Sequence, residues 1–259
     1  MDLWAKALEE MKRLSVSAGE EILRIYQTPF AVEYKLDASP VTQADKAAND
    51  IIVEGLKQIF PQIPVLAEES ADDKSRLLYR YCFIVDPLDG TREFIQKKDE
   101  FTVNIALCED GVPVAGVIYA PVQRELYGAS LGKGAYLMAG DGETRLRVSS
   151  RTENVRMTVS RSHKDPELLT VAREKGIEHF IEAGSAYKAC LIARGDAEIY
   201  YRSGRIMEWD TAAMQILVTE AGGIFNGLDG RPFRYNKEDT RNPTGFYILN
   251  HPANALLPR

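Results

Sequence analysis

The feature that most constrains the fold is a change in hydrophobic period near residue 64. Before it, apolar residues between positions 4 and 25 recur every three or four residues, which predicts one long amphipathic helix. Thr42, followed three residues later by Asp45, is typical of a helix start, and the apolar spacing over 48–59 predicts a second helix. After residue 64 the period becomes that of strands, so two helices precede a sheet.

The rest of the chain divides into a strand-rich part and an alternating part. A hairpin turn is expected at 109–111, where Asp-Gly tolerates a positive φ. The predicted strands are 65–67, 81–85, 101–108, 112–119, 126–130, 134–137, 155–159, 197–201 and 246–249, with helices from 165 and over 185–194 and 210–221. The polar segment 139–151 is the expected boundary. We therefore predict an α+β lobe over 1–145 and an α/β lobe over 146–259.

Composition excludes several classes of protein. Lys plus Arg number 32 against 38 Asp plus Glu, a net charge of −6, so a nucleic-acid polymer is not an expected partner. No apolar run reaches the roughly 18 residues of a membrane span, and the N-terminal segment does not resemble a signal peptide. The three cysteines form no C-x-x-C pair, which predicts buried thiols in a cytoplasmic protein.

Acidic residues gather at predicted strand ends. Glu68 and Asp86 each follow a buried strand, Asp89 comes three residues later, and Gly90-Thr91 opens a predicted helix. Carboxylates placed together repel one another unless a cation neutralises them, and hard oxygen ligands suit Mg²⁺. The amides at the helix start are positioned to hold a phosphate group. The pattern predicts a site for a metal ion and a phosphate ester.

These residues resemble a known signature. The segments Glu68-Glu69, 86–91 (DPLDGT), Trp209-Asp210 and 220–223 (EAGG) are similar to those of the inositol monophosphatase superfamily, over about residues 41–249. The resemblance implies a layered αβαβα sandwich of the sugar-phosphatase type, with two sheets and helical layers. It also implies a homodimer and inhibition by lithium.

The resemblance implies a mechanism and its residues. Water activated by metal would attack phosphorus in line, with no phosphorylated protein intermediate. Glu68 and Thr91 would position and help to deprotonate this water, with Asp45 behind Thr91. Two or three Mg²⁺ ions would be held by Glu68, Asp86, the Leu88 carbonyl, Asp89 and Asp210.

Within the superfamily the chain looks most like the CysQ-type 3′(2′),5′-bisphosphate nucleotidases. The segments 86–95, 101–107, 160–163, 184–188 and 242–246 carry this likeness. It implies hydrolysis of adenosine 3′,5′-bisphosphate to AMP and phosphate, with its sulfated relative as a further substrate. Arg161 and Lys188 are the chief expected partners of the second phosphate. The full substrate-binding set would be Glu68, Leu88, Asp89, Gly90, Thr91, Ser160, Arg161, Ser162, His163, Ser185, Lys188, Arg202 and Asp210.

Three alternatives remain open from the sequence. Inositol monophosphatases typically carry a Glu where this chain has Ser203, flanked by Arg202 and Arg205, which favours the bisphosphate over an inositol or fructose phosphate. The stretch 204–208 departs from the nucleotidase pattern, so base recognition is open and the inositol-1-phosphatase and fructose-1,6-bisphosphatase activities stay as alternatives. The others are a non-catalytic phosphate or nucleotide sensor and an aspartyl-phosphate phosphatase with Asp86 as nucleophile.

Overall fold

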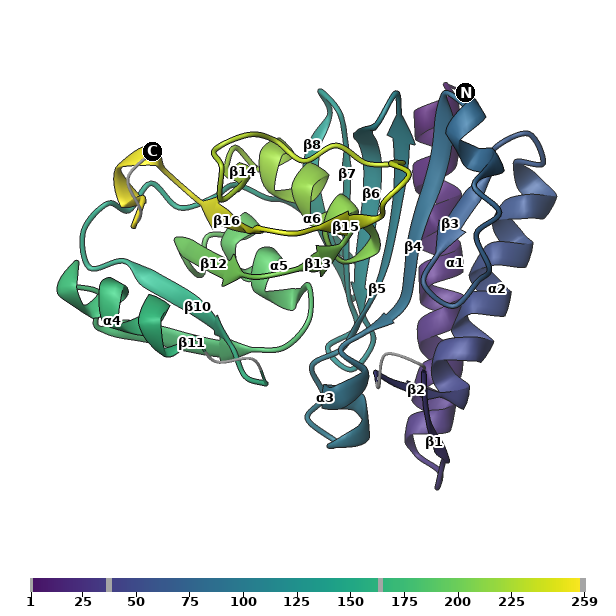
Figure 1. Ribbon diagram of the computed structural model, residues 1–259, viewed down its shortest axis with the longest axis horizontal. Coiled ribbons are helices and arrows are strands. Elements are labelled where there is room, and N and C mark those ends of the chain that lie inside the picture. The colour runs from purple at the N-terminus through teal and green to yellow at the C-terminus, as the bar shows by residue number, and fades with distance from the viewer. Residues whose placement is uncertain (1, 36–38, 163–164, 257–259) are drawn as a thin grey trace.

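The protein is described from a computed structural model covering residues 2–35, 39–162 and 165–256. Five layers follow one another: helices, a sheet, helices, a second sheet and a last helix (Figure 1). The predicted αβαβα sandwich is confirmed. The helices are α1 (Leu3–Tyr26), α2 (Gln43–Ile59), α3 (Thr91–Ile95), α4 (Pro166–Glu174), α5 (Tyr187–Ala193) and α6 (Glu208–Glu220), with 3-10 turns η1 (Ser75–Leu78) and η2 (Pro252–Asn254).

The larger sheet has seven strands in the order β3-β4-β5-β6-β7-β8-β9. β3 pairs parallel to β4, and every later neighbour is antiparallel. One face is covered by α1 and α2, and the other by α6 (Figure 1). The strands are β3 (Val65–Ala67), β4 (Tyr81–Asp89), β5 (Thr102–Glu109), β6 (Val112–Ala120), β7 (Glu125–Ser130), β8 (Gly134–Ala139) and β9 (Gly142–Arg145).

The smaller sheet has five strands in the order β11-β10-β12-β16-β14. β10 is parallel to both β11 and β12, with α4 and α5 as the connecting helices, whereas β16 is antiparallel to β12 and β14. Asp165 caps α4 by accepting from the Leu168 amide at 3.0 Å, as the Asp-Pro start predicts. The strands are β10 (Arg156–Ser160), β11 (His179–Ala183), β12 (Ile199–Ser203), β14 (Ile224–Gly227) and β16 (Gly245–Leu249).

Two short strand pairs complete the description. They are β1 (Val32–Tyr34) with β2 (Pro40–Thr42), and β13 (Ile206–Met207) with β15 (Arg241–Asn242), both antiparallel. No helix among the described residues is long and apolar enough to span a membrane. Cys82, Cys108 and Cys190 are free and buried, as expected.

The structure differs from the predicted elements in three respects. β4 does not end at residue 85 but continues to Asp89, because a bulge between Asp86 and Asp89 lets the strand keep pairing with β5. The polar segment 139–151 contains β9, an exposed edge strand whose polar residues give no buried alternation. The strands β11 and β14 were not predicted, because both are short and only partly buried.

Candidate active site

Three carboxylates meet where the larger sheet faces α6. Asp86 and Asp89 lie on either side of the β4 bulge, and Asp210 lies in the first turn of α6. One oxygen of each lies within 4.8 Å of the others. Asp86 is only 1% exposed. The bulge is the reason that Asp86 and Asp89 reach the same point although they are three positions apart in the strand.

Burial and mutual repulsion disfavour the charged form of these groups. Burial raises the pKa of Asp89 to about 6 and that of Asp210 to about 7. The pKa of Asp86 is raised well above its ordinary value, first by burial and then by the charges of Glu68, Asp89 and Asp210. A cation at this point would relieve the repulsion among the three carboxylates.

The donor set fits a hard divalent cation. Three carboxylates supply oxygen atoms only, and no soft ligand belongs to the cluster. Each carboxylate has one or two donors among the described residues: Asp86 accepts from the Leu88 amide at 3.1 Å, Asp210 from the Met207 amide at 2.9 Å, and one oxygen of Asp89 from two donors, at 2.6 and 3.4 Å. The remaining oxygen lone pairs are therefore open to a metal ion.

Glu68, a predicted metal ligand, does not belong to this cluster. Its carboxylate accepts from the Lys35 ammonium at 2.8 Å, and the same ammonium also pairs with Glu69. Burial lowers the pKa of Lys35, but its attraction to Glu68 and Glu69 outweighs this and raises the pKa overall. Glu68 still lines the same cavity as Asp89 and Asp210. No local pattern of residues indicates the Lys35 contact, because it joins segments that come together only in the folded chain.

Thr91 and Asp45 lie together as expected. The Thr91 hydroxyl is 3.0 Å from Asp45 Oδ1 and 3.3 Å from the Leu88 carbonyl oxygen. Asp45 is held from its other side by Thr42, whose amide and hydroxyl donate to Oδ2 at 2.7 and 2.6 Å. The capping box of α2 therefore also orients the carboxylate behind Thr91.

The backbone conformation at residue 90 requires glycine. Its φ of +93° is in the region that L side chains rarely adopt, and a Cβ there would come 3.1 Å from the Glu100 carbonyl oxygen. This conformation turns the chain from β4 into α3 and places Thr91 at the start of the helix.

A cavity of about 260 Å³ joins the carboxylates to two basic residues. Asp89 and Asp210 line one part, and Lys188 and Arg202 line the same hollow. Lys188 is 4% exposed, donates to the Ser185 carbonyl at 2.7 Å, and lies 5.2 Å from the centre of the Tyr200 ring. Burial lowers the pKa of Lys188 to about 8, against the pull of Asp89. The other predicted residues on this lining are Glu68, Gly90, Thr91, Ser160 and Ser185.

A second cavity of about 960 Å³ shares the lining residues Ser160, Tyr200 and Arg202 with the first. Its walls come from β10–β12 and the start of α4, and they include the aromatic rings of Phe180 and Tyr201. The Nε atom of Arg202 is buried and has no hydrogen-bond partner among the described residues. The combined space is large enough for a ligand with a polar end and a flat apolar part.

Arg161 and Ser162 do not line the cavity that Lys188 and Arg202 share with the carboxylates. The Nε and Nη2 atoms of Arg161 both donate to Glu100 at 2.8 Å, and Nη1 donates to Glu182 at 3.2 Å. Arg161 lines a separate shallow hollow with these carboxylates. Ser162 donates to the carboxylate of Glu93. His163, also expected at the second phosphate, lies outside the described residues.

Comparison with known proteins agrees with this geometry. The profile of the inositol monophosphatase family matches residues 4–252. The chain belongs to the inositol monophosphatase family. Among its relatives, the 3'(2'),5'-bisphosphate nucleotidase CysQ of Salmonella typhimurium is 39% identical, over 93% of this chain and 98% of that protein. The corresponding protein of Escherichia coli K12 is 38% identical over the same shares.

Solved structures of this family share the fold. CysQ from Bacteroides thetaiotaomicron superimposes with a TM-score of 0.84 at 38% identity, covering 95% of this chain and 98% of that one. An inositol monophosphatase from Thermotoga maritima gives 0.81 at 26% identity, covering 95% and 92%. The family is metal-dependent, in agreement with the carboxylate cluster.

Two residues around Asp89 were missed by sequence reasoning. Asp89 Oδ2 accepts from the Ala186 amide at 2.6 Å and from the Asn104 side chain at 3.4 Å. Asn104 faces Asp86 across β4 and β5, so the pairing of these strands would have indicated it. The Ala186 contact has no local sequence signal, because it joins α5 to the end of β4.

Proposed function

We propose that this protein is a 3′(2′),5′-bisphosphate nucleotidase. It is a phosphoric monoester hydrolase that removes the 3′-phosphate of adenosine 3′,5′-bisphosphate, giving AMP and phosphate, and it also accepts the sulfated relative. The observation that carries this proposal is one cavity lined by Asp89 and Asp210 together with Lys188 and Arg202. The relatives named as bisphosphate nucleotidases support the same activity.

The cation at the carboxylates is Mg²⁺, with two or three ions per site. Asp86, Asp89 and Asp210 would hold it, together with the Leu88 carbonyl and Glu68, whose carboxylate is paired with Lys35 in this structure. When bound, the ions lower the pKa of water and stabilise charge on the leaving oxygen. Every carboxylate of the cluster must be ionised to bind them, so the raised pKa values of Asp89 and Asp210 make metal binding depend on pH.

Thr91 and Asp45 act on the attacking water. Asp45 accepts the hydroxyl proton of Thr91, so the Thr91 oxygen presents a lone pair to a neighbouring water. Burial raises the pKa of Asp45, although the donors on Thr42 and Thr91 oppose this effect. Glu68, on the same lining, orients the water and receives its proton.

The second phosphate and the nucleoside lie away from the metal. Lys188, Ser185 and Ser160 hold the second phosphate, and Arg202 contributes a charged donor with an unused Nε. The nucleoside extends into the larger cavity beside Phe180 and Tyr201. Arg161 does not bind the second phosphate directly, because its guanidinium is already paired with Glu100 and Glu182.

Two further proposals concern the whole chain. Residues 1–145 form a lobe that supplies most metal ligands, and residues 146–259 form a lobe that supplies Asp210 and the substrate-specificity residues. The enzyme works as a homodimer, and its partners do not include a nucleic-acid polymer. Sedimentation velocity over a range of concentrations tests the dimer, and a monomer at every concentration would contradict it.

The deciding experiment is a kcat/KM panel with and without Li⁺. It compares adenosine 3′,5′-bisphosphate, its sulfated relative, inositol 1-phosphate and fructose 1,6-bisphosphate, each with Mg²⁺. We expect the two nucleotides to exceed the others by more than about a hundredfold, since each added charge-assisted contact contributes several-fold or more. A preference for either sugar phosphate, or no turnover of any of the four, contradicts the proposal.

A further inference from the structure

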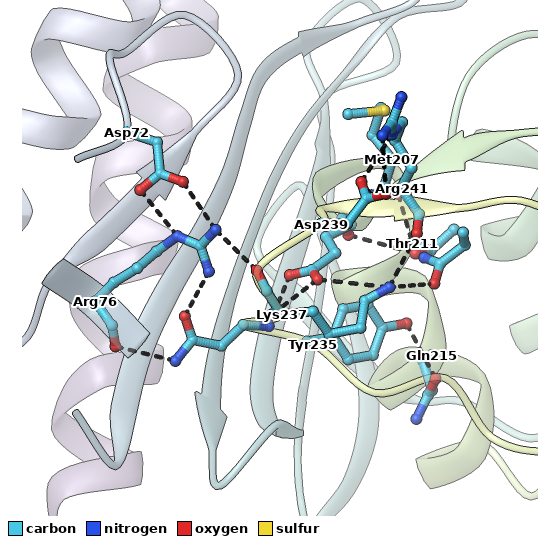
Figure 2. A network of polar contacts seen from close by, with 12 residues as sticks. Asp72, Arg76, Met207, Thr211, Gln215, Tyr235, Lys237, Asp239 and Arg241 are labelled. Carbon is cyan, nitrogen blue, oxygen red and sulfur yellow. Dashed lines mark hydrogen bonds and ion pairs between the residues drawn. The ribbon is translucent and has the colours of Figure 1, made fainter. Parts of the chain in front are cut away.

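A buried polar network joins the loop after β3 to the start of α6. At its centre, Arg76 of η1 is 2% exposed. Its guanidinium forms a two-pronged contact with Asp72 at 3.1 and 2.8 Å, donates to Asn236 Oδ1 at 2.8 Å and donates to the Lys237 carbonyl at 2.9 Å. The Asn236 side chain returns a bond to the Arg76 carbonyl at 3.2 Å. Figure 2 shows Arg76 between Asp72 and the segment that carries Lys237.

The other half of the network is Glu208, the first residue of α6. Its side chain is wholly buried, and its two oxygens accept from the amides of Asn236 and Lys237 at 2.7 and 3.1 Å. The Lys237 ammonium lies 3.7 Å from the same carboxylate and donates to Asn242 Oδ1 at 2.7 Å. Segment 236–237 is thus clamped by Arg76 on one side and by Glu208 on the other.

Both ends of this clamp are close in sequence to residues of the proposed metal site. Glu208 precedes Asp210 by two residues, and the turn between them is closed by the Met207 amide donating to Asp210. At the other end, Arg76 closes the loop that begins with Glu68-Glu69 directly after β3. None of Arg76, Asn236 or Glu208 lines the cavity.

We propose that Arg76, Asn236 and Glu208 are positioning residues that set the place of Asp210 relative to the carboxylates of the larger sheet. This inference rests on the proposed function, because it takes Asp210 as a metal ligand. A carboxylate contributes fully to a metal site only when its oxygen is held at the coordination distance. Side chains that orient a ligand without touching the metal typically change metal affinity or activity about 10- to 100-fold when removed.

Three substitutions test the network. Glu208→Gln keeps the shape but presents an NH₂ group to one of the two amides, so one N–H loses its acceptor. Arg76→Lys keeps the charge but loses the forked contact to Asp72 and Asn236. Asn236→Ala removes the side-chain bonds to Arg76 but keeps the bond from Arg76 to the Lys237 carbonyl and the backbone amide that Glu208 binds. Asp239→Asn is the matched control, because it breaks the exposed pair with Arg241 in the same segment.

The readout is Mn²⁺ binding to the substrate-free protein, followed by the electron paramagnetic resonance signal of the free ion. We expect Glu208→Gln and Arg76→Lys to weaken the binding about tenfold or more, Asn236→Ala to weaken it several-fold, and Asp239→Asn to leave it unchanged. With substrate, kcat at limiting Mg²⁺ falls and recovers at high Mg²⁺, whereas KM changes little. Urea unfolding of the metal-free variants identifies any loss that is due to unfolding.

Mn²⁺ affinity within twofold of the unsubstituted protein in folded Glu208→Gln and Arg76→Lys overturns the proposal. If Glu208→Gln does not fold, Arg76→Lys and Asn236→Ala decide the matter. Asp210→Asn distinguishes a failure of the proposed metal site from a failure of the proposed positioning role. If it leaves Mn²⁺ binding unchanged, the metal site of the proposed function is wrong. If it weakens binding while the network variants do not, only the positioning role is wrong.

Discussion

At the scale of single residues, the site is a place where charges oppose folding. Asp210 and Asp89 lie close to each other and are partly buried, and each has a raised pKa. A carboxyl group whose pKa is higher in the folded than in the unfolded protein stabilises the fold only while protonated. Its contribution is complete below the unfolded pKa of about 4 and is lost as the pH rises through the folded value. Without metal, these two carboxylates therefore destabilise the folded protein at neutral pH.

The first prediction follows for Asp210→Asn. At about pH 8, metal-free Asp210→Asn should unfold at higher urea than the unsubstituted chain, by about 1–2 kcal/mol in the free energy of unfolding, because one buried charge is gone. The difference should shrink as the pH falls and disappear near about pH 3, where the carboxyl group is protonated in both the folded and the unfolded state. Activity should fall by orders of magnitude. Asp141→Asn, which removes an exposed charge, is the control, and equal stability of both variants at pH 8 would refute the argument.

The second prediction contrasts Lys188 with Arg161. Lys188→Met keeps most of the buried volume but removes the ammonium from the cavity, so KM for adenosine 3′,5′-bisphosphate should rise about tenfold or more. KM for inositol 1-phosphate should change much less. Arg161→Gln should change either KM by less than about threefold, because Glu100 and Glu182 already occupy this guanidinium. Steady-state kinetics with both substrates decides, and a larger effect of Arg161 than of Lys188 would reverse the assignment.

At the scale of elements, the ends of helices and strands do most of the positioning. The β4 bulge places Asp86 and Asp89 together, and the capping box of α2 holds Asp45 against Thr91. One oxygen of Asp45, Oδ2, completes the cap of α2, and the other, Oδ1, accepts from Thr91. A local folding signal and a site contact are carried by one side chain.

The third prediction concerns Thr42→Ala. The substitution removes the hydroxyl that caps α2 and donates to Asp45, so the free energy of unfolding should drop by about 1–2 kcal/mol. Asp45 then loses a donor that orients it, and kcat should fall several-fold at saturating Mg²⁺. Thr42→Ser retains the hydroxyl and should keep most of both properties. Unfolding in urea and kcat are measured on the same samples, and a loss of stability with unchanged kcat would disconnect the cap from the reaction.

At the scale of the whole molecule, the site depends on layers that come from distant parts of the chain. β4 lies in the larger sheet, and α6 packs on that sheet although it comes late in the sequence. The smaller sheet supplies Tyr200 and Arg202 from β12, across the cavity from Asp89. The cavity therefore exists only when the layers are stacked.

The fourth prediction concerns removal of the metal. Mg²⁺ should raise the melting temperature of the whole protein, because a ligand that binds only the folded state stabilises it by about 2.7 kcal/mol at a hundred times its Kd. The effect should be larger at pH 8 than at pH 6, since protons occupy Asp210 and Asp89 below their pKa values of about 7 and 6. Thermal melts with Mg²⁺ or EDTA at both pH values measure it. An equal shift at the two values would exclude these carboxylates as the pH-sensitive ligands.

Local signals in the amino-acid sequence were sufficient for the helices, the cap at Thr42, most strands and the acidic residues of the site, whereas the layered fold came from the resemblance to a known family. These features depend on spacing and residue type over a few positions. The pairing of Arg161 with Glu100, of Lys35 with Glu68, and of Arg76 with Asn236, 160 residues away, has no such signal. A charged side chain has many possible partners in the sequence, and packing of the layers selects one of them. The chemistry was therefore readable from the sequence, whereas the partner of each charged group was decided by the tertiary structure.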